Sequence, residues 1–214
     1  MTTERAAELE ALNQEVRVCP LCDLAKTRTK AVPGEGPVDA EIMFIGEGPG
    51  FNEDRQGRPF VGQAGQLLVE LLASIGLQRT EVYITNVVKC RPPENRDPFP
   101  YEIAACAPYL DRQLRIINPR VVVTLGRYSM AKFFPGVTIS RIHGQPKRAD
   151  GRIYYPIIHP AAALRRPESM TALKADTLRI PDLLVEARAM AVSGEGAGAP
   201  AVEEAPKQLG LFDF

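Results

Sequence analysis

The amino-acid sequence predicts an α/β fold of three layers, with a central, mostly parallel sheet of four strands between two layers of helices. Short apolar runs that suit buried strands alternate with longer segments that carry helix signals, and this alternation is typical of parallel sheets covered on both faces. Because the carboxyl ends of parallel strands meet at one edge of a sheet, residues that directly follow the strands should lie together there. Four residues suited to a binding site occupy such positions: Glu47, Asn86, Gly126 and His159.

In the first part of the chain we expect an amphipathic helix over residues 3–16, where apolar side chains recur on one helical face. The apolar run 42–45 suits a buried strand. It leads into residues 46–50, GEGPG, whose glycines and proline bend the backbone tightly and let a ligand approach it closely. A second helix is expected over residues 63–75, before Gly76.

The sequence of the loop 46–50 leaves two interpretations open. The phosphate-binding motifs GxxxxGK[ST] and GxGxxG are absent at the required position. The loop is therefore either a binding loop that carries the carboxylate of Glu47 or a tight structural connection with a solvated glutamate. The pattern of the whole chain favours binding, because ligands of α/β units lie beyond the carboxyl ends of the strands.

The second part of the chain continues the alternation of strands and helices. Helix signals over residues 101–117 stop at Asn118 and Pro119. Two strands, 137–142 and 152–158, are predicted to form a hairpin through a turn at residues 149–151, which places His143 on the hairpin surface. The remaining predicted elements are strands at 82–85 and 120–125, a short helix at 128–134 and a helix at 169–190.

The charge distribution favours a partner that carries phosphates. The chain has 26 basic and 26 acidic residues, but residues 18–190 hold 23 basic and 18 acidic ones. Clusters of basic residues are usually solvated surface, yet three of the four clusters here lie in loops rich in glycine and proline, which favours a phosphate-contacting face. The clusters are Lys26 with Arg28 and Lys30, Lys89 with Arg91, Lys147 with Arg148, and Arg165 with Arg166.

The four cysteines are predicted to be reduced, and two of them show the spacing of a thiolate-ligated group. We expect a cytoplasmic protein without a membrane segment, because neither a signal peptide nor a long apolar run is present. Disulfides are rare in that compartment. Cys19 and Cys22 form a C-x2-C knuckle of the kind that holds a metal or a cluster, and two further cysteines follow at Cys90 and Cys106.

Several motifs in a fixed order resemble those of the family 4 uracil-DNA glycosylases. They are GEGPG at 46–50, GRPFVG at 57–62, TNVVKCRPP at 85–93, HPAA at 159–162 and the spacing of the four cysteines. The resemblance covers residues 15–190. It implies a monofunctional base-excision-repair enzyme that flips uracil out of DNA and hydrolyses its N-glycosidic bond, leaving an abasic site. Two alternatives are a non-enzymatic iron–sulfur module that binds nucleic acid, and a glycosylase of the same superfamily with broader damaged-base specificity.

The resemblance implies a role for each residue of a uracil pocket. Phe60 would stack on the flipped base, and Gly48 would contact it through the backbone. The amide of Asn86 would pair with O4 and N3–H of uracil and reject cytosine, which presents the opposite pattern. His159 would donate to O2 as negative charge builds on the departing base.

Two carboxylates and one loop complete the implied machinery. Glu47 would position or activate the attacking water and offset positive charge on the sugar. Glu53 would lie beside C5 of uracil, where it excludes the methyl group of thymine. Residues 163–166 resemble a loop that enters the duplex, with Leu164 as the wedge and Arg165 and Arg166 on the phosphates. His143 has no counterpart in this assignment.

For the cysteines the resemblance implies a [4Fe-4S] cluster held by Cys19, Cys22, Cys90 and Cys106. Thiolates bind zinc and iron–sulfur clusters alike, so a structural zinc and four unrelated buried thiols are the alternatives. Structural zinc usually uses two compact knuckles, whereas these ligands are spread over a long stretch of the chain. That spread favours a cluster with a structural role.

The chain is predicted to form a single domain over residues 1–190, including the cysteine-bearing N-terminal segment, followed by a disordered tail at 191–214. The composition of residues 192–207 changes to Gly, Ala, Pro, Ser and Glu. The sequence QLGLF, from Gln208 to Phe212, resembles the peptide that binds the bacterial sliding clamp. We expect a monomer whose substrate is uracil-containing DNA, single- or double-stranded.

Overall fold

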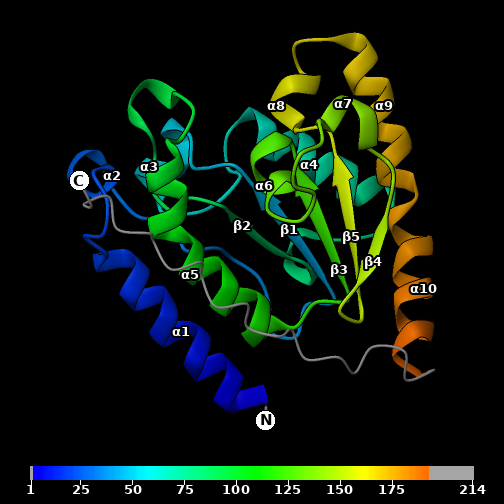
Figure 1. Ribbon diagram of the computed structural model, residues 1–214, viewed down its shortest axis with the longest axis horizontal. Coiled ribbons are helices and arrows are strands. Elements are labelled where there is room, and N and C mark those ends of the chain that lie inside the picture. Colours follow the sequence, from blue (N-terminus) through cyan, green and yellow to red (C-terminus); the bar gives the residue numbers. More distant parts are fainter. Residues whose placement is uncertain (1, 193–214) are drawn as a thin grey trace, which may run out of the picture.

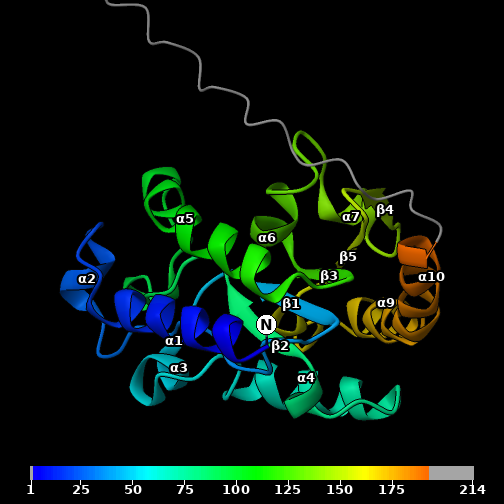
Figure 2. The same cartoon turned by 90° about the horizontal axis from the view of Figure 1, so that it is seen from below.

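The computed structural model describes residues 2–192 and has three layers, with a five-stranded sheet in the order β2-β1-β3-β5-β4 between two groups of helices (Figures 1 and 2). Four strands are parallel and the edge strand β4 is antiparallel to β5. The predicted fold class is therefore confirmed, with one strand more than expected. The strands are β1 Ile42–Gly46, β2 Tyr83–Asn86, β3 Val121–Leu125, β4 Lys147–Ala149 and β5 Arg152–Ile157.

The prediction of a strand over residues 137–142 is wrong, and β4 takes the place beside β5 that this segment was expected to fill. That segment contains the short helix α7, Ile139–Ile142, and the strand paired with β5 lies further along the chain. The β-branched residues of the segment suggested a strand, but Val137 is exposed and has no sheet to cover it. β4 is instead short and carries Lys147 and Arg148, features that protect the edge of a sheet from pairing with other chains.

Helices cover both faces of the sheet. α1 (Thr2–Val18), α5 (Pro100–Ile117) and α6 (Arg127–Ala131) lie on one face. α4 (Gln63–Ser74), α9 (Pro167–Leu178) and α10 (Ile180–Val192) lie on the other face. The shorter helices are α2 Leu24–Thr27, α3 Phe51–Gln56, η1 Arg79–Glu81, η2 Pro93–Asn95 and α8 Pro160–Ala163.

The alternation of side chains along β1 shows how the two cores form. Met43 and Ile45 point into the core shared with α1 and α5, whereas Ile42 and Phe44 point into the core shared with α4. This period of two is that of a strand, and every residue of β1 is buried because helices cover both faces. The N-terminal helix packs on α5 in the first of these cores.

The C-terminal part of the described chain differs from the single helix predicted over 169–190. It forms α9 and α10, with the break at Arg179. Pro181 lies in the first turn of α10, where its missing N–H costs nothing, but a helix that ran through it would lose a backbone hydrogen bond. The predicted tail at 191–214, with the clamp-binding peptide at 208–212, lies essentially outside the described residues. No helix among residues 2–192 is long and apolar enough to cross a membrane.

The order of the strands creates a switch point between β1 and β3. The chain leaves β1 through α4 to reach β2 on one side, and it leaves β3 toward β5 on the other side. Ligands of open α/β sheets bind in the crevice beyond the carboxyl ends of the strands at such a point. The loops after β1 and β3 therefore flank the place where the sequence predicts the site.

Candidate active site

A pocket of about 560 Å³ lies at the carboxyl edge of the sheet, beside the switch point. It brings together residues from the loops after all four parallel strands and from the loop before α4. Leu164 and Arg166 are the predicted DNA-contacting residues that do not line it. The predicted site residues that line the pocket are Glu47, Gly48, Glu53, Phe60, Asn86, His159 and Arg165.

Glu47 directly follows β1 and is half-buried in the pocket wall. Its backbone carbonyl accepts a hydrogen bond from the N–H of Val88 at 3.0 Å, which joins the glycine-rich loop to the segment after β2. Burial raises the pKa of Glu47 above its ordinary value of 4.5, and the negative charge of Asp97 acts in the same direction. The Arg127 guanidinium opposes both effects. A carboxylate with a raised pKa in a pocket is a functional-site signal.

Asn86 ends β2 and is 1% exposed, with its side chain in the pocket wall. Its Oδ1 is buried and has no hydrogen-bond partner among residues 2–192. Gly46, on the adjacent strand, makes this placement possible, because a Cβ there would lie 2.4 Å from Oδ1 of Asn86. An unpaired amide oxygen is costly in a protein interior, so this atom is poised for a ligand that can donate a hydrogen bond.

Lys89 holds the end of β2 in place. It is 1% exposed, and its Nζ donates to the backbone carbonyl of Asn86 at 2.7 Å, to Thr85 Oγ1 at 2.6 Å and to Gln113 Oε1 at 2.6 Å. The prediction that Lys89 belongs to a phosphate-contacting cluster is therefore wrong. The side chain cannot reach solvent, and its three donors are used inside the protein.

His159 caps the N-terminus of α8. Its Nδ1 accepts a hydrogen bond from the N–H of Ala161 at 3.1 Å, so the ring proton lies on Nε2. Burial lowers the pKa of His159 to about 4, which keeps the imidazole neutral near pH 7. Gly126, at φ +84°, allows this close packing because a Cβ would lie 2.9 Å from Cβ of His159.

Phe60 presents its ring to the same pocket. The centroids of the Phe60 and His159 rings lie 5.8 Å apart, with 30° between the ring planes. Phe60 has φ +50°, an uncommon backbone conformation for a residue other than glycine. Two glycines accommodate it: a Cβ on Gly65 would lie 2.0 Å from the Phe60 carbonyl oxygen, and one on Gly46 would lie 2.7 Å from Cζ of the ring.

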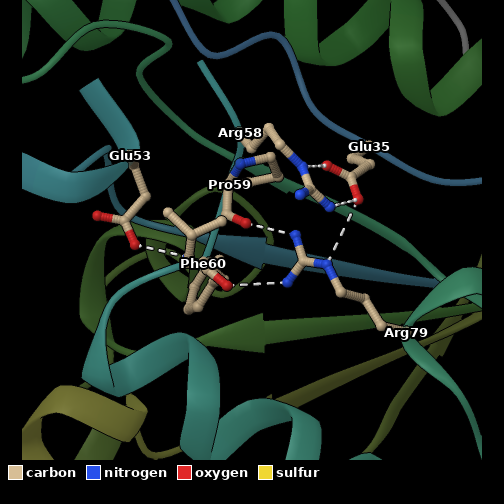
Figure 3. Close-up of polar contacts among 7 residues, drawn as sticks. Glu35, Glu53, Arg58, Pro59, Phe60 and Arg79 are labelled. Atoms are coloured by element: carbon tan, nitrogen blue, oxygen red, sulfur yellow. Dashed lines mark hydrogen bonds and ion pairs between the residues drawn. The ribbon is translucent and has the colours of Figure 1, made fainter. Parts of the chain in front are cut away.

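Two charged side chains hold the Phe60 loop from opposite sides (Figure 3). On one side, Arg79 donates from Nη1 to the Phe60 carbonyl at 2.9 Å and from Nη2 to the Pro59 carbonyl. On the other side, one carboxylate oxygen of Glu53 accepts from two backbone N–H groups at 2.8 Å each, those of Val61 and Gly62. The carbonyls of residues 59 and 60 and the N–H groups of residues 61 and 62 are thus all hydrogen-bonded. These four hydrogen bonds hold the strained backbone conformation of Phe60.

A second carboxylate supports this arrangement behind the loop. Glu35 pairs with Arg58, through contacts of 2.7 Å from Nε and from Nη2, and its Oε1 lies 3.5 Å from Nε of Arg79 (Figure 3). The Arg58 side chain is largely exposed, whereas that of Arg79 is mostly buried. The Arg58 hydrogen bond is the main cause that lowers the pKa of Glu35.

The rim of the pocket carries charges that the sequence interpretation missed. Arg127 and Arg96 both line the pocket; Arg127 pairs with Asp97, and Arg96 pairs with the buried Glu102 at 2.7 Å. Arg127 directly follows Gly126 at the end of β3, so the rule that found the other strand-end residues would have found it. Arg79 carried no such signal, because its partners are separated from it by about 20 residues along the chain.

The predicted DNA-contacting loop lies at the end of α8. Leu164 is an apolar residue that is 47% exposed, and Arg165 lines the pocket. Within the described part of the chain, neither Arg165 nor Arg166 forms an ion pair. The surface position of Leu164 suits a wedge, and the roles of the three residues stay predictions.

His143 is not on a hairpin surface, as the sequence analysis expected. It follows α7 and its Nδ1 lies 2.8 Å from Oδ2 of Asp176, a mostly buried residue of α9. The adjacent Gly144 packs closely on the same carboxylate, since a Cβ there would lie 2.4 Å from Asp176 Oδ1. His143 therefore anchors the segment before β4 to α9.

The four cysteines line one small cavity, separate from the pocket. None of the four forms a disulfide within the described residues. N–H groups point at three of the sulfur atoms: Leu21 N lies 3.5 Å from Cys19 Sγ, Arg28 Nη1 lies 3.1 Å from Cys90 Sγ, and Lys89 N lies 3.3 Å from Cys106 Sγ. Among residues 2–192, no group of three or more His, Cys, Asp or Glu side chains lies close enough together to hold a metal ion.

Three of the basic residues that were expected to contact phosphates have partners within the protein. Arg28 donates to the Cys19 carbonyl at 2.8 Å as well as to Cys90, and Lys26 pairs with Asp23 at 2.6 Å. Arg148 pairs with Glu186 on α10, away from the pocket. Of the four predicted clusters, only Arg91 and the pair after α8 keep guanidinium groups without carboxylate partners near the pocket.

The open α/β sheet with a pocket at its carboxyl edge is the architecture of a ligand-binding or catalytic α/β protein. A model of the uracil DNA glycosylase superfamily matches residues 33–180, and the chain belongs to this superfamily. It is 49% identical over 187 residues to the type-4 uracil-DNA glycosylase of Sulfurisphaera tokodaii, covering 83% of this chain and 85% of that protein. It is 48% identical to the type-4 uracil-DNA glycosylase of Archaeoglobus fulgidus, covering 82% and 92%.

A type-5 uracil-DNA glycosylase from Pyrobaculum aerophilum is more distant, at 33% identity over 62% of this chain and 66% of that protein. The resemblance to family 4 that the sequence motifs indicated is therefore confirmed.

Proposed function

We propose that this protein is a monofunctional DNA-repair glycosylase that flips uracil out of DNA and hydrolyses its N-glycosidic bond, leaving an abasic site. The observation that carries the proposal is the buried, unpaired Oδ1 of Asn86 in a pocket that also holds Phe60 and His159. A base that enters such a pocket must leave the DNA stack.

Base selection follows from the donors and acceptors of Asn86. Its Oδ1 accepts a hydrogen bond from N3–H of uracil, and its Nδ2 donates to O4. Cytosine presents an acceptor at N3 and a donor at N4, so it leaves both groups of the buried amide unsatisfied. Phe60 stacks on the base, and Glu53 lies beside C5, where its position disfavours the methyl group of thymine.

His159 stabilises the leaving group. When the bond between C1′ and N1 breaks, its electron pair leaves with uracil and negative charge builds on O2. The Nε2–H of His159 is directed by the bond that Nδ1 accepts from Ala161. A neutral donor of fixed orientation stabilises this charge without reorganising in the transition state.

Glu47 acts on the other side of the breaking bond. Its carboxylate orients the attacking water, which adds its oxygen to C1′ and releases a proton that passes through solvent to the departing uracil anion, and the negative charge of Glu47 offsets the positive charge that develops on the sugar. The half-buried position strengthens this electrostatic effect.

We further propose that Cys19, Cys22, Cys90 and Cys106 hold a [4Fe-4S] cluster. Four thiols around one cavity, with N–H groups directed at three of them, suit a group that is ligated by thiolates. The cluster would supply a cross-link among the N-terminal segment, the segment after β2 and α5. Iron and acid-labile sulfide are measured per chain: about four of each would support the cluster, and zinc without sulfide would overturn it.

For the DNA itself, we propose that Leu164 fills the space left by the flipped nucleotide while Arg165 and Arg166 bind the flanking phosphates. The protein would act as a monomer, and residues 208–212 would bind the sliding clamp. A clamp pull-down with the chain ended at residue 207 tests the last point.

The decisive experiment measures uracil release from oligonucleotides with one central deoxyuridine, single-stranded or paired with G or A. Asn86→Ala and Glu47→Ala should each lose at least about 10²-fold in rate, while Asn13→Ala on α1 should match the wild type. Thymine and cytosine oligonucleotides report specificity. No release by a folded protein would overturn the proposal in favour of a nucleic-acid-binding module, and release of other damaged bases at similar rates would favour the broader glycosylase.

A further inference from the structure

Two arginines next to segments that line the pocket lack the carboxylate partners that Arg96 and Arg127, in the pocket lining, have in Glu102 and Asp97. Away from the pocket, arginines typically pair with carboxylates, as Arg112 does with Glu15, Arg148 with Glu186 and Arg188 with Glu41. Within residues 2–192, Arg55 and Arg91 form no ion pair, and each is close in sequence to residues that line the pocket, Arg55 to Glu53 and Arg91 to Pro92. Their charges are therefore available to a ligand.

An exposed aromatic ring lies close to both of these arginines. Phe51 is the first residue of α3 and follows Gly50, which lines the pocket. It is 52% exposed. The guanidinium carbon of Arg55 lies 5.6 Å from the ring centroid, and that of Arg91 lies 5.3 Å from it. Both distances are within the range of cation–π interactions.

The position of Arg91 is fixed by the loop after β2. Its Nε donates to Oδ1 of Asn95 at 2.7 Å, which leaves the two terminal amino groups for another partner. Glu94 and Asn95 have φ of 55° and 57°, so the loop holds two successive residues in the left-handed region to place this contact. Asn95 itself lines the pocket.

An unpaired nucleotide matches these features. A base stacks on an exposed aromatic ring, and the adjacent phosphate neutralises a guanidinium group. A base inside a duplex is stacked on both faces by its neighbours, so it cannot lie on a protein ring without being freed first. α3 and the DNA-contacting loop after α8 lie on opposite sides of the carboxyl edge of the sheet (Figure 1), so a strand that crosses the pocket can reach both.

We propose that Phe51, Arg55 and Arg91 form a nucleotide-binding site for an unpaired base next to the flipped uracil, with Phe51 as the stacking surface and the arginines on its phosphate. This inference rests on the proposed function, because the flipped nucleotide places the strand. It makes the protein favour single-stranded or locally unpaired DNA over a fully paired duplex.

The test measures binding of a uracil-free single-stranded oligonucleotide and of the matching duplex by fluorescence anisotropy. Phe51→Ala should weaken single-strand binding about 5- to 150-fold, the range that corresponds to the loss of one stacked base, and change duplex binding much less. Phe51→Trp should restore it. Arg55→Gln and Arg91→Gln should each reduce the dependence of binding on salt by about one phosphate contact.

Phe99 supplies a matched control. It is also exposed, at 46%, and a guanidinium lies 3.9 Å from its ring, but that guanidinium belongs to Arg96, which is paired with Glu102. Phe99→Ala should therefore bind both DNA forms as the wild type does. Thermal melting of each variant reports whether it is folded.

Three outcomes would overturn the inference: unchanged single-strand binding in Phe51→Ala, an equal loss for single strand and duplex, or displacement of the oligonucleotide by a glutamate-rich peptide at similar concentration. The proposed function fails differently. A protein that releases no uracil but needs Phe51 to bind single strands would retain this site and lose the glycosylase assignment.

Discussion

The pocket and the cavity lined by cysteines are both assembled from distant parts of the chain, yet they are held in different ways. In the pocket, the protein's own hydrogen bonds position three of the functional elements: Ala161 orients His159, Lys89 holds the end of β2, and Arg79 and Glu53 hold the Phe60 loop. At the cysteines, three N–H groups point at sulfur atoms, where they would stabilise the negative charge of thiolates. The pocket is preorganised, whereas the cysteine site, under the proposed [4Fe-4S] ligation, would be completed by its ligand.

This difference separates the two contributions to function. A preorganised site stabilises developing charge without moving, so its variants should alter the rate of the chemical step. A site completed by its ligand contributes to folding, as bound metals do, so its variants should alter stability. Lys89 connects them directly, since its N–H faces Cys106 and its Nζ holds Asn86.

The largest effect should come from the pH dependence of Glu47. Its raised pKa means that the carboxyl group stays protonated up to a pH above its ordinary 4.5, so the rate should rise with pH through that higher value and then level off. His159, with a pKa of about 4, would protonate only at lower pH. Single-turnover rates from pH 4 to 9 measure the profile.

The matched variant for this profile is Glu47→Gln, which keeps the shape of the side chain and removes the titrating group. It should lower the plateau about 10²-fold or more and abolish the acid limb above pH 4.5. If the limb persisted in Glu47→Gln, the titrating group would lie elsewhere and the role of Glu47 would be wrong.

A smaller effect should come from the clamp on the Phe60 loop. Arg79→Met leaves the carbonyls of Pro59 and Phe60 without their donor, and loss of such partners costs about 1–3 kcal/mol. If that cost falls on the position of the ring, the rate of the chemical step should drop roughly tenfold, with little change in the affinity for DNA. Single-turnover rates and anisotropy measure the two separately.

Two controls decide whether Arg79 acts through Phe60. Arg58→Met removes the other partner of Glu35 but no bond to the Phe60 or Pro59 carbonyl, and it should change the rate little. In a Phe60→Ala background, Arg79→Met should have no further effect on the rate. Additive losses in the double variant would mean that Arg79 supports the fold in general rather than the ring.

Arg79 also marks the limit of what the sequence could predict. The strands and the residues that follow them were predictable because apolar runs and their ends are local features, and Glu47, Asn86 and His159 do meet in one pocket. The motif resemblance added Phe60 and Glu53. The bond from Arg79 to the Phe60 carbonyl was not predictable, because a side chain that binds backbone groups of a distant loop leaves no pattern in its own neighbourhood.

The errors have the same cause. Residues 137–142 carry strand-forming residues but find no place in the sheet, so tertiary structure overrides local preference. Lys89 looked like a surface charge because it lies between a strand and a loop rich in proline, and only packing shows that its ammonium group is enclosed. Local patterns located the edge of the sheet, and long-range contacts determined which charges face the solvent there.

The smallest effect on the chemical step should come from the cysteine site. Cys106→Ser removes a sulfur from α5 while the pocket keeps its own bonds, so the rate at 25 °C should stay within about tenfold of the wild type. The melting temperature should instead fall by about 10 °C, as expected for a loss of a few kcal/mol in a domain of this size. Calorimetry and single-turnover rates on the same preparation compare the two effects.

Lys89→Met sharpens the contrast, because it removes the bond to the Asn86 carbonyl and leaves all four cysteines in place. It should lower the rate more than Cys106→Ser does and lower the iron content less. The reverse order, with the cysteine variant losing activity while its melting temperature stays unchanged, would mean that the cysteine site acts on the chemistry and that the separation between the two regions is wrong.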